Sequence, residues 1–294
     1  MIEAAEKPQS PGRRQLVLGL LPLLSGVGAA HAQEEPDGLA RIRANGALKV
    51  ALYNAFPPFS AQSAQGMQGL DVSLAQALAR AMGLQLSLLP FDGDENMNDD
   101  LRNMVWKGHY LGYGPADVML HVPVDKYFMQ QNRQALIFAP YMREQVVLVR
   151  DTRRLPDVAG AADLKGVPLA AERGTGAASA LIGHDDRLLS AQVHLYADGV
   201  KAVQAVLQGE AAAAYVTRAQ AESAIFHAQP KPQQLEISEF PLPGVPAQGW
   251  LVGMAIKARN EALGQALQQA LDSLRGSGEL LAIFKQHGLT FTAP

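Results

Sequence analysis

A strand, a helix and a second strand follow one another early in the chain, and this order most constrains the fold. The apolar run 48–53 predicts a buried strand. Apolar residues at four-residue spacing predict a helix over 71–82, with Asp71 as its N-cap. Residues 84–88 alternate between apolar and polar side chains, which predicts the next strand. Because such a unit pairs its strands in parallel and needs helices over the sheet, we expect an α/β protein.

A second α/β unit follows the first along the chain. Its expected elements are strands at 144–149, 167–171 and 212–216, and helices at 175–182 and 200–207. Prolines between residues 229 and 249 are expected to exclude regular structure there. A strand at 250–256 and an amphipathic helix over 263–274 complete the pattern.

The first 32 residues have the pattern of an export signal. Arg13 and Arg14 precede an apolar stretch at 16–27, and residues 30–32 form an A-x-A site, so cleavage is expected after Ala32. The arginine pair also resembles a twin-arginine signal. A glycine precedes the pair where that pattern usually has Ser or Thr, so the general export route is favoured.

Composition narrows the class of protein further. The chain has no cysteine, which excludes a lipid anchor of the kind attached to cysteine, disulfides and cysteine–metal sites. No segment is long and apolar enough for a membrane anchor. The formal net charge of −3 argues against nucleic-acid binding. We therefore expect a freely soluble, monomeric protein of the bacterial periplasm.

Landmarks of a known protein family recur across residues 45–290. They are Phe56-Pro57-Pro58-Phe59 and the segments 69–75, 117–119, 133–141, 164–176 and 260–288. In this order they resemble the family-3 extracellular solute-binding proteins, the bilobed receptors of polar amino-acid importers. The resemblance implies a periplasmic-binding-protein type II fold, in which two α/β lobes joined by a hinge close on a ligand. Lobe 1 is expected to comprise 33–142 and 236–294, and lobe 2 to comprise 143–235.

Departures from the amino-acid receptors point to a narrower branch. The expected strand at 212–216 has no carboxylate where those receptors commonly hold the ligand ammonium, which makes an α-amino acid a doubtful ligand. The polar segment 93–112, together with 116–125, resembles the branch associated with quinoprotein alcohol and methanol dehydrogenases. That resemblance implies binding of a small polar ligand, of a periplasmic pyrroloquinoline-quinone (PQQ) dehydrogenase, or of both.

Two other functions remain open on the same fold. One is the substrate receptor of a polar amino-acid or organic-acid ABC importer, which would work with an ABC permease. The other, less favoured, is a dehydratase. The chain has no nucleophile elbow, zinc helix or phosphate loop, so we expect no catalysis and no cofactor. A dehydratase would need a general acid, for which His121, Asp125 and Glu172 are the candidates.

A small polar or anionic ligand is expected to contact residues from both lobes. The candidates are Phe56, His121, Arg133, Arg173, Gly174, Thr175, Gly176 and Thr217. The turn 173–176 connects a strand to a helix, so its N–H groups would favour an anion, or it is a plain glycine turn capped by Thr175. Phe56 would stack on the ligand or only pack its turn. Arg133 would pair with a carboxylate or form a surface salt bridge, and His121 would face the cleft or be structural.

The segment 93–112 carries the candidate partner surface. Its members are Asp99, Arg102, Trp106, His109 and Tyr110. Aromatic residues are enriched in interface cores, but these could equally pin the segment to its own lobe. Acidic and amide residues from Asp92 onward suggest a calcium loop. Met97 and Asn103 stand where that loop requires Gly and Glu, so no metal is expected.

Overall fold

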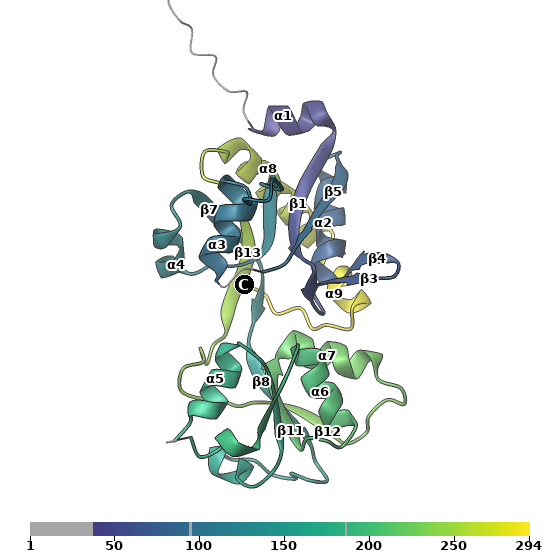
Figure 1. Cartoon of the computed structure of the whole chain (residues 1–294). Coiled ribbons are helices and arrows are strands. Elements are labelled where there is room, and N and C mark those ends of the chain that lie inside the picture. The colour runs from purple at the N-terminus through teal and green to yellow at the C-terminus, as the bar shows by residue number, and fades with distance from the viewer. Residues whose placement is uncertain (1–37, 94–95, 186) are drawn as a thin grey trace, which may run out of the picture. The chain divides into compact units, whose positions relative to one another are not determined.

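The computed structural model describes residues 38–93, 96–185 and 187–294 (Figure 1). The export signal expected over 1–32 lies outside these residues. Within them, the strands form two five-stranded sheets and one three-stranded sheet. In the same residues, no helix combines the length and apolarity needed to span a bilayer.

The first sheet has the order β5-β1-β6-β13-β7. Its strands are β1 (Ala47–Tyr53), β5 (Gln85–Phe91), β6 (Val118–Pro123), β7 (Ala135–Glu144) and β13 (Trp250–Lys257). β1 pairs in parallel with β5 and β6, as the strand–helix–strand pattern predicts. β13 pairs antiparallel with β6 and β7, so a segment from late in the chain closes this sheet.

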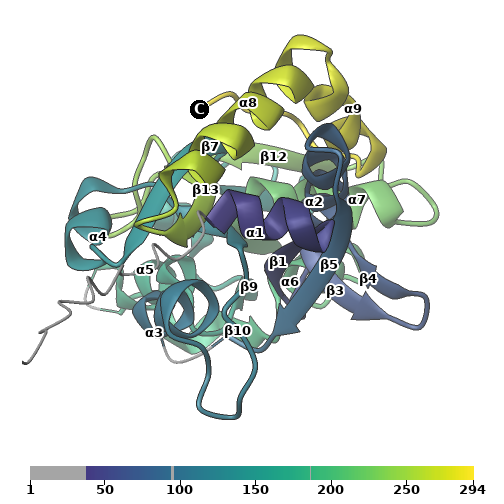
Figure 2. The ribbon, with the colours of Figure 1, turned by 90° about the horizontal axis from the view of Figure 1, so that it is seen from above.

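Helices cover both faces of the first sheet, and the sequence alternates accordingly. Val50 and Leu52 of β1 join one core, while Ala51 between them joins the other. The helices that contribute to the first core are α1 (Gly38–Asn45), α2 (Leu70–Ala81), α8 (Glu261–Gly276) and α9 (Glu279–Gln286). Figure 2 shows α8 and α9 lying beside each other. Leu101, at the end of α3 (Met97–Leu101), is buried in the core on the other face of this sheet, which also includes Ala51.

The second sheet has the order β10-β9-β11-β8-β12. Its strands are β8 (Val146–Asp151), β9 (Leu169–Glu172), β10 (Val193–Tyr196), β11 (Ala213–Thr217) and β12 (Leu235–Glu239). β9 pairs in parallel with β10 and β11, whereas β8 is antiparallel to β11 and β12. Helix α5 (Gly176–Gly183) packs on one face, and α6 (Gly199–Leu207) and α7 (Arg218–His227) pack on the other.

The small sheet and a few short elements complete the described chain. The small sheet consists of β2 (Ala55–Phe56), β3 (Ser60–Ser63) and β4 (Gly66–Gln68). The remaining elements are the π-helical turn Arg102–Trp106, helix α4 (Lys126–Gln131) and the 3₁₀ turns Ala161–Leu164 and Ser190–Gln192.

Strand β12 corrects the prediction that 229–249 has no regular structure. It pairs with β8 over its whole length, from Leu235 to Glu239. The prolines of this segment bracket the strand at positions 232 and 241 and leave its own N–H groups intact, which permits the pairing.

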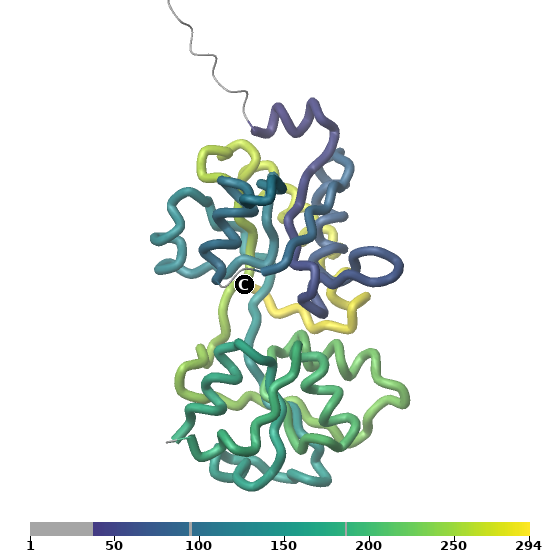
Figure 3. The backbone as a smooth tube through the Cα atoms, in the orientation of Figure 1, coloured from purple at the N-terminus to yellow at the C-terminus, as the bar shows by residue number. Residues whose placement is uncertain are grey.

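Between the two sheets, the described chain crosses at Gln145 and again over 240–249 (Figure 3). Because β12 belongs to the second sheet, the expected lobe boundary between 235 and 236 falls inside a strand, and the return to the first sheet comes at Trp250. The two α/β sheets and the crossing segments between them are the architecture that the sequence predicts.

The start of α2 corrects a second prediction. Gly69 occupies the N-cap with φ 132°, and the helix begins at Leu70. A Cβ on Gly69 would approach the carbonyl oxygen of Phe59 to 2.3 Å, so this turn requires glycine. Asp71 is therefore not the N-cap: it lies inside the first turn, where its side chain is completely buried.

Candidate functional site

A cavity of about 310 Å³ lies at one end of the second sheet. The parallel strands β9 and β11 both end here, at Glu172 and Thr217, and α5 and α7 begin directly after. In open α/β sheets, ligands bind outside the carboxyl ends of the strands. The lining residues of this Glu172 cavity are Phe56, Val146, Glu172, Thr175, Gly176, Ala177, Tyr215, Val216, Thr217, Gln220, Gly244, Val245, Pro246 and Trp250.

Glu172 is the acid of this cavity. Its Oε2 accepts a hydrogen bond of 2.6 Å from Nε2 of Gln220. Burial raises the pKa of the Glu172 carboxyl, and the negative charge of nearby Asp198 raises it further. None of the ion pairs in the described part of the chain includes Glu172. The carboxylate therefore has an amide partner but no cationic one.

Two threonines hold the helix starts at the cavity. Thr175 caps α5, because its Oγ1 accepts from the N–H of Ala178 at 3.1 Å and donates to the carbonyl of Glu172 at 2.9 Å. Thr217 caps α7 in a capping box with Gln220, whose Oε1 accepts from the Thr217 N–H at 3.2 Å. Gln220 thus joins the start of α7 to Glu172, which fixes the carboxylate in place.

Aromatic side chains form the apolar wall. Phe56 and Trp250 reach the cavity from β2 and β13, and Tyr215 lies on β11. The Tyr215 hydroxyl donates to the carbonyl of Phe240 at 2.8 Å, so the ring is held with its polar end satisfied. Sequence reasoning did not select Trp250 or Gln220, because neither lies in a motif and only the fold brings them to β9.

His121 belongs to a buried polar cluster beside the cavity. Its Nδ1 lies 2.8 Å from Oδ2 of Asp71, in a hydrogen bond, and its backbone N–H donates to the Tyr141 hydroxyl at 3.1 Å. That hydroxyl donates to Oδ1 of Asp71 at 2.8 Å. The imidazole packs against Phe56, with ring centroids 4.8 Å apart. His121 thus supports a wall of the Glu172 cavity and also lines a neighbouring cavity of about 450 Å³.

The structure brings together some of the predicted ligand residues and not others. Phe56, Thr175, Gly176 and Thr217 line the Glu172 cavity, and His121 and Gly174 line the neighbouring one. Arg133 and Arg173 are exposed and line neither of these two cavities. Arg133 follows α4, which intervenes between β6 and β7 and carries the chain away from the ends of the strands.

Glu144 is a second acid near the cavity, at the last position of β7. It is paired in register with Trp250, and its Oε1 accepts from the N–H of Gln145 at 2.9 Å. Its Oε2 has no hydrogen-bond partner within the described chain. Burial raises the pKa of this carboxyl to about 7. The sequence gives no signal for this group, since burial at the crossing segment arises only in the fold.

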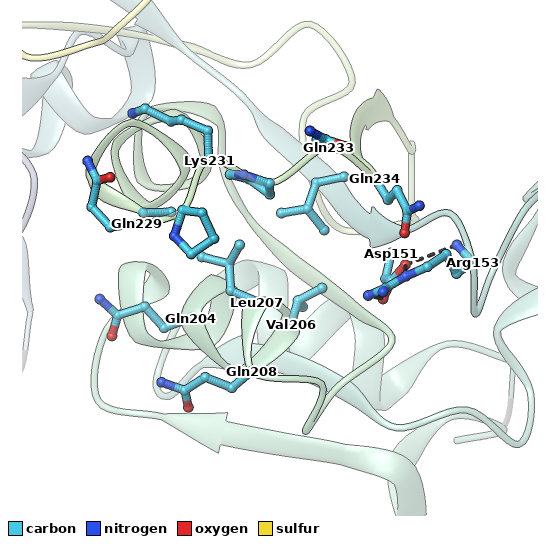
Figure 4. A pocket seen from close by; sticks show the side chains of 14 residues that line it. Asp151, Arg153, Gln204, Val206, Leu207, Gln208, Gln229, Lys231, Gln233 and Gln234 are labelled. Carbon is cyan, nitrogen blue, oxygen red and sulfur yellow. Dashed lines mark hydrogen bonds and ion pairs between the residues drawn. The ribbon is translucent and has the colours of Figure 1, made fainter.

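A larger hollow of about 730 Å³ lies elsewhere on the second sheet (Figure 4). Glutamines and a proline-containing segment line much of it, including Gln204, Gln229 and Lys231. Its carboxylate, Asp151, is already paired with Arg153 at 2.7 Å. None of the predicted ligand residues reaches this hollow, so we place the candidate site at the Glu172 cavity.

The predicted partner residues lie on and beside a projecting loop, 107–115. Tyr110 is 88% exposed and Leu111 is 67% exposed, and the His109 ring stacks on Tyr113 with centroids 4.3 Å apart. By contrast, Trp106 is partly buried against the core of its own sheet. Asp99 and Arg102 form an ion pair of 2.9 Å with each other.

One further candidate, Asp125, has a local structural role. Asp125 accepts from the N–H of Phe128 at 2.8 Å and so caps α4 on the surface. In the described residues, no group of three or more His, Cys, Asp or Glu side chains could hold a metal ion.

No protein-family model matches the chain. Curated relatives match parts of it. The L-cystine-binding protein of Escherichia coli K12 is 32% identical over 83 residues, which cover 28% of this chain and 31% of that protein. Cyclohexadienyl dehydratase of Pseudomonas aeruginosa is 27% identical over 128 residues, which cover 42% of each chain. The chain thus spans less than half the length of these relatives.

Solved structures match over most of the chain. An ancestral cationic amino-acid solute-binding protein has a TM-score of 0.67 at 19% identity, covering 85% of this chain and 99% of that one. A polar amino-acid receptor from Streptococcus thermophilus has a TM-score of 0.66 at 18% identity, covering 90% and 94%. The type II periplasmic-binding-protein fold predicted from the sequence is therefore confirmed.

Proposed function

We propose that this protein is a periplasmic solute-binding protein of family 3 that captures a small polar molecule in the Glu172 cavity for an ABC importer. The observation that carries this proposal is the cavity itself. It lies at the carboxyl ends of β9 and β11, between two capped helix starts, on a fold shared with amino-acid receptors. Binding would engage Phe56 on β2 of the small sheet and Trp250 on β13 of the first sheet. It would also engage Glu172 and Thr217 at the ends of β9 and β11 in the second sheet, and Thr175 at the start of α5.

The geometry favours binding over dehydration. Asp125 caps an exposed helix, and His121 is held by Asp71 and Tyr141. Glu172 alone of the three candidate acids lines the cavity. The likeness to a dehydratase rests on 42% of the chain at 27% identity.

Filling the cavity tests the receptor function directly. Gly176 opens α5, and a Cβ there meets no atom within 4 Å, so Gly176→Phe adds a ring without a backbone clash. We expect it to weaken ligand binding at least tenfold, because the ring takes volume from a cavity of about 310 Å³. Gly183→Phe at the other end of α5 is the matched control, since Gly183 also has free space but does not line the cavity.

The chain supplies its own reporter for this test. It has two tryptophans, Trp106 and Trp250, so Trp106→Phe leaves Trp250 in the cavity wall as the sole indole. Titration of this variant with amines, amino acids, organic acids, alcohols and aldehydes would follow Trp250 fluorescence and the melting temperature together. A ligand at 100 times its Kd should stabilise the protein by about 2.7 kcal/mol. If no compound in the panel stabilises the protein, the receptor function is wrong.

A second candidate function is docking on a periplasmic PQQ-dependent dehydrogenase, favoured by one observation. Tyr110 and Leu111 expose large apolar surface at the tip of the loop 107–115. Single exposed apolar residues are common, but two adjacent ones above a His109–Tyr113 stack form a compact contact surface. The resemblance of 93–112 to dehydrogenase-associated proteins suggests this partner.

The double substitution Tyr110→Ser with Leu111→Ser tests this docking. We expect the stability to change by less than about 0.5 kcal/mol, because both side chains are exposed, while co-purification with the dehydrogenase is lost. Tyr127→Ser on α4 is the control, since Tyr127 is 70% exposed but lies outside the loop. Unchanged recovery of the dehydrogenase with the double variant would rule out this loop as the docking surface.

A further inference from the structure

We propose that the ligand is an organic cation without a carboxylate group, whose positive group binds Glu172 while its apolar part packs against Phe56, Tyr215 and Trp250. The inference rests on the proposed receptor function and specifies its ligand class. It departs from the small polar or anionic ligand that the turn 173–176 suggests.

The charge of the cavity is the first support. Glu172 is a half-buried carboxylate whose Oε2 is held by an amide, and it belongs to no ion pair of the described chain. Withdrawal from water and the neighbouring Asp198 both disfavour its negative charge, as its raised pKa shows. A cation placed beside Glu172 would compensate both effects. An anion there would meet repulsion that grows as water is excluded.

The second support is that no cationic side chain of the described residues lines the cavity to pair with an anionic ligand. No Lys, Arg or His of the described residues lines the Glu172 cavity. The neighbouring cavity has Asp92 and Asp100 on its walls. In the described chain, its lining has no Lys or Arg, and its histidine, His121, is already hydrogen-bonded to Asp71. Arg133, which was expected to pair with a carboxylate, and Arg173, which follows Glu172 in the chain, are both exposed and line neither cavity. A ligand carboxylate would therefore lose its water without gaining a charged partner.

The caps at the cavity reduce what the helix starts could offer an anion. At α5 the Thr175 hydroxyl already accepts from the N–H of Ala178. At α7 the Thr217 hydroxyl accepts from the N–H of Gln220. These caps occupy donors that an anion would otherwise use, and Glu172 stands between the two helix starts. The capping pattern thus weakens the anion-binding interpretation of 173–176.

The aromatic walls are the third support. Phe56, Tyr215 and Trp250 face the same cavity as Glu172. The faces of aromatic rings attract cations, most strongly when water is excluded, and tryptophan is the best of them. A cavity that holds a carboxylate beside aromatic rings suits a ligand with an ammonium, amidinium or quaternary ammonium group. It suits a ligand with a free carboxylate poorly.

Matched pairs of compounds test the inference on the wild-type protein. Each pair shares a cationic group and differs by a carboxylate: agmatine and arginine, cadaverine and lysine, histamine and histidine, choline and glycine betaine. Titrations followed by tryptophan fluorescence and by melting temperature would give the affinity of both members. We expect at least one carboxylate-free member to bind, and at least tenfold more tightly than its carboxylate-bearing partner.

Glu172→Gln tests the role of the charge itself. The amide keeps an oxygen that can accept from Gln220 but removes the negative charge, so we expect binding of the cation to weaken at least tenfold. Glu239→Gln is the matched control, because it removes one charge from an exposed position on β12. Melting temperatures without ligand show whether each variant is folded, and the wild-type pairs decide the question even if Glu172→Gln is unstable.

The outcomes separate this inference from the receptor function beneath it. Tighter binding of an amino acid or organic acid than of its carboxylate-free partner would overturn the cation inference and leave the receptor function standing. Cation binding that Glu172→Gln leaves unchanged would also overturn it. Failure of every matched pair, with binding of another compound from the wider panel, would overturn the cation inference alone. Failure of the wider panel as well would reject the receptor function, and this inference with it.

Discussion

Replacing Asp71 by alanine is expected to lower the free energy of unfolding by about 4 kcal/mol, because it removes the carboxylate that two buried side chains hydrogen-bond. The Tyr141 hydroxyl and Nδ1 of His121 each lie 2.8 Å from one of the Asp71 carboxylate oxygens. Asp71 and Tyr141 have no exposed surface, so water cannot replace the lost contacts. Urea denaturation monitored by circular dichroism would measure the change.

Two further variants separate the network from the loss of a charge. Tyr141→Phe removes only the hydroxyl and should cost about 1–3 kcal/mol, less than the loss of Asp71. Asp272→Ala removes an exposed aspartate that pairs with Arg275 and should change stability by less than about 1 kcal/mol. Equal losses for Asp71→Ala and Asp272→Ala would show that the buried cluster does not stabilise the fold.

Replacing Glu144 by glutamine is expected to change how stability depends on pH, by on the order of 3 kcal/mol between pH 4.5 and 7. Burial raises the pKa of Glu144 from 4.5 to about 7, so the folded chain retains this proton at pH values where the unfolded chain has lost it. Its contribution is therefore complete below pH 4.5 and is lost as the pH rises to about 7. Glutamine does not ionise, so the variant should lack this loss and exceed the wild type in stability above that range.

The difference between wild type and variant isolates this one group, because all other titrating groups are shared. Denaturation curves between pH 4 and pH 8 would measure it. Glu261→Gln is the control, since Glu261 is exposed in the first turn of α8 and should leave the pH profile unchanged. Parallel profiles for wild type and Glu144→Gln would show that Glu144 does not titrate in this range.

Local rules were sufficient for much of the fold. The buried runs that became β1, β9, β11 and β13, and the amphipathic segments that became α2, α6 and α8, follow from hydrophobic period and glycine position. The same rules missed β12, because a short strand between prolines cannot be distinguished from a loop by its sequence alone. They also misplaced Asp71, because an acid at a helix start resembles a cap until the preceding turn is known.

Parts of the candidate site were predictable from local motifs. The turn at Gly174-Thr175 and the aromatic Phe56 were chosen for their motifs, and both reach the cavities at the ends of the strands. Arg133 was chosen by its spacing along the chain, but α4 intervenes and leaves it exposed elsewhere. Glu172 was weighed only as an acid for catalysis, since nothing in the sequence shows that it lacks a cationic partner.

The sequence by itself determined the α/β class and the order of most elements, because hydrophobic period acts over a few residues. Only the tertiary structure decided which charges are compensated. Gln220 reaches Glu172, Trp250 lines the same cavity as Glu172, and Glu144 is buried at a crossing segment through contacts between residues far apart in the chain. The strength of an electrostatic interaction depends on distance and on exclusion of water, and the fold sets both.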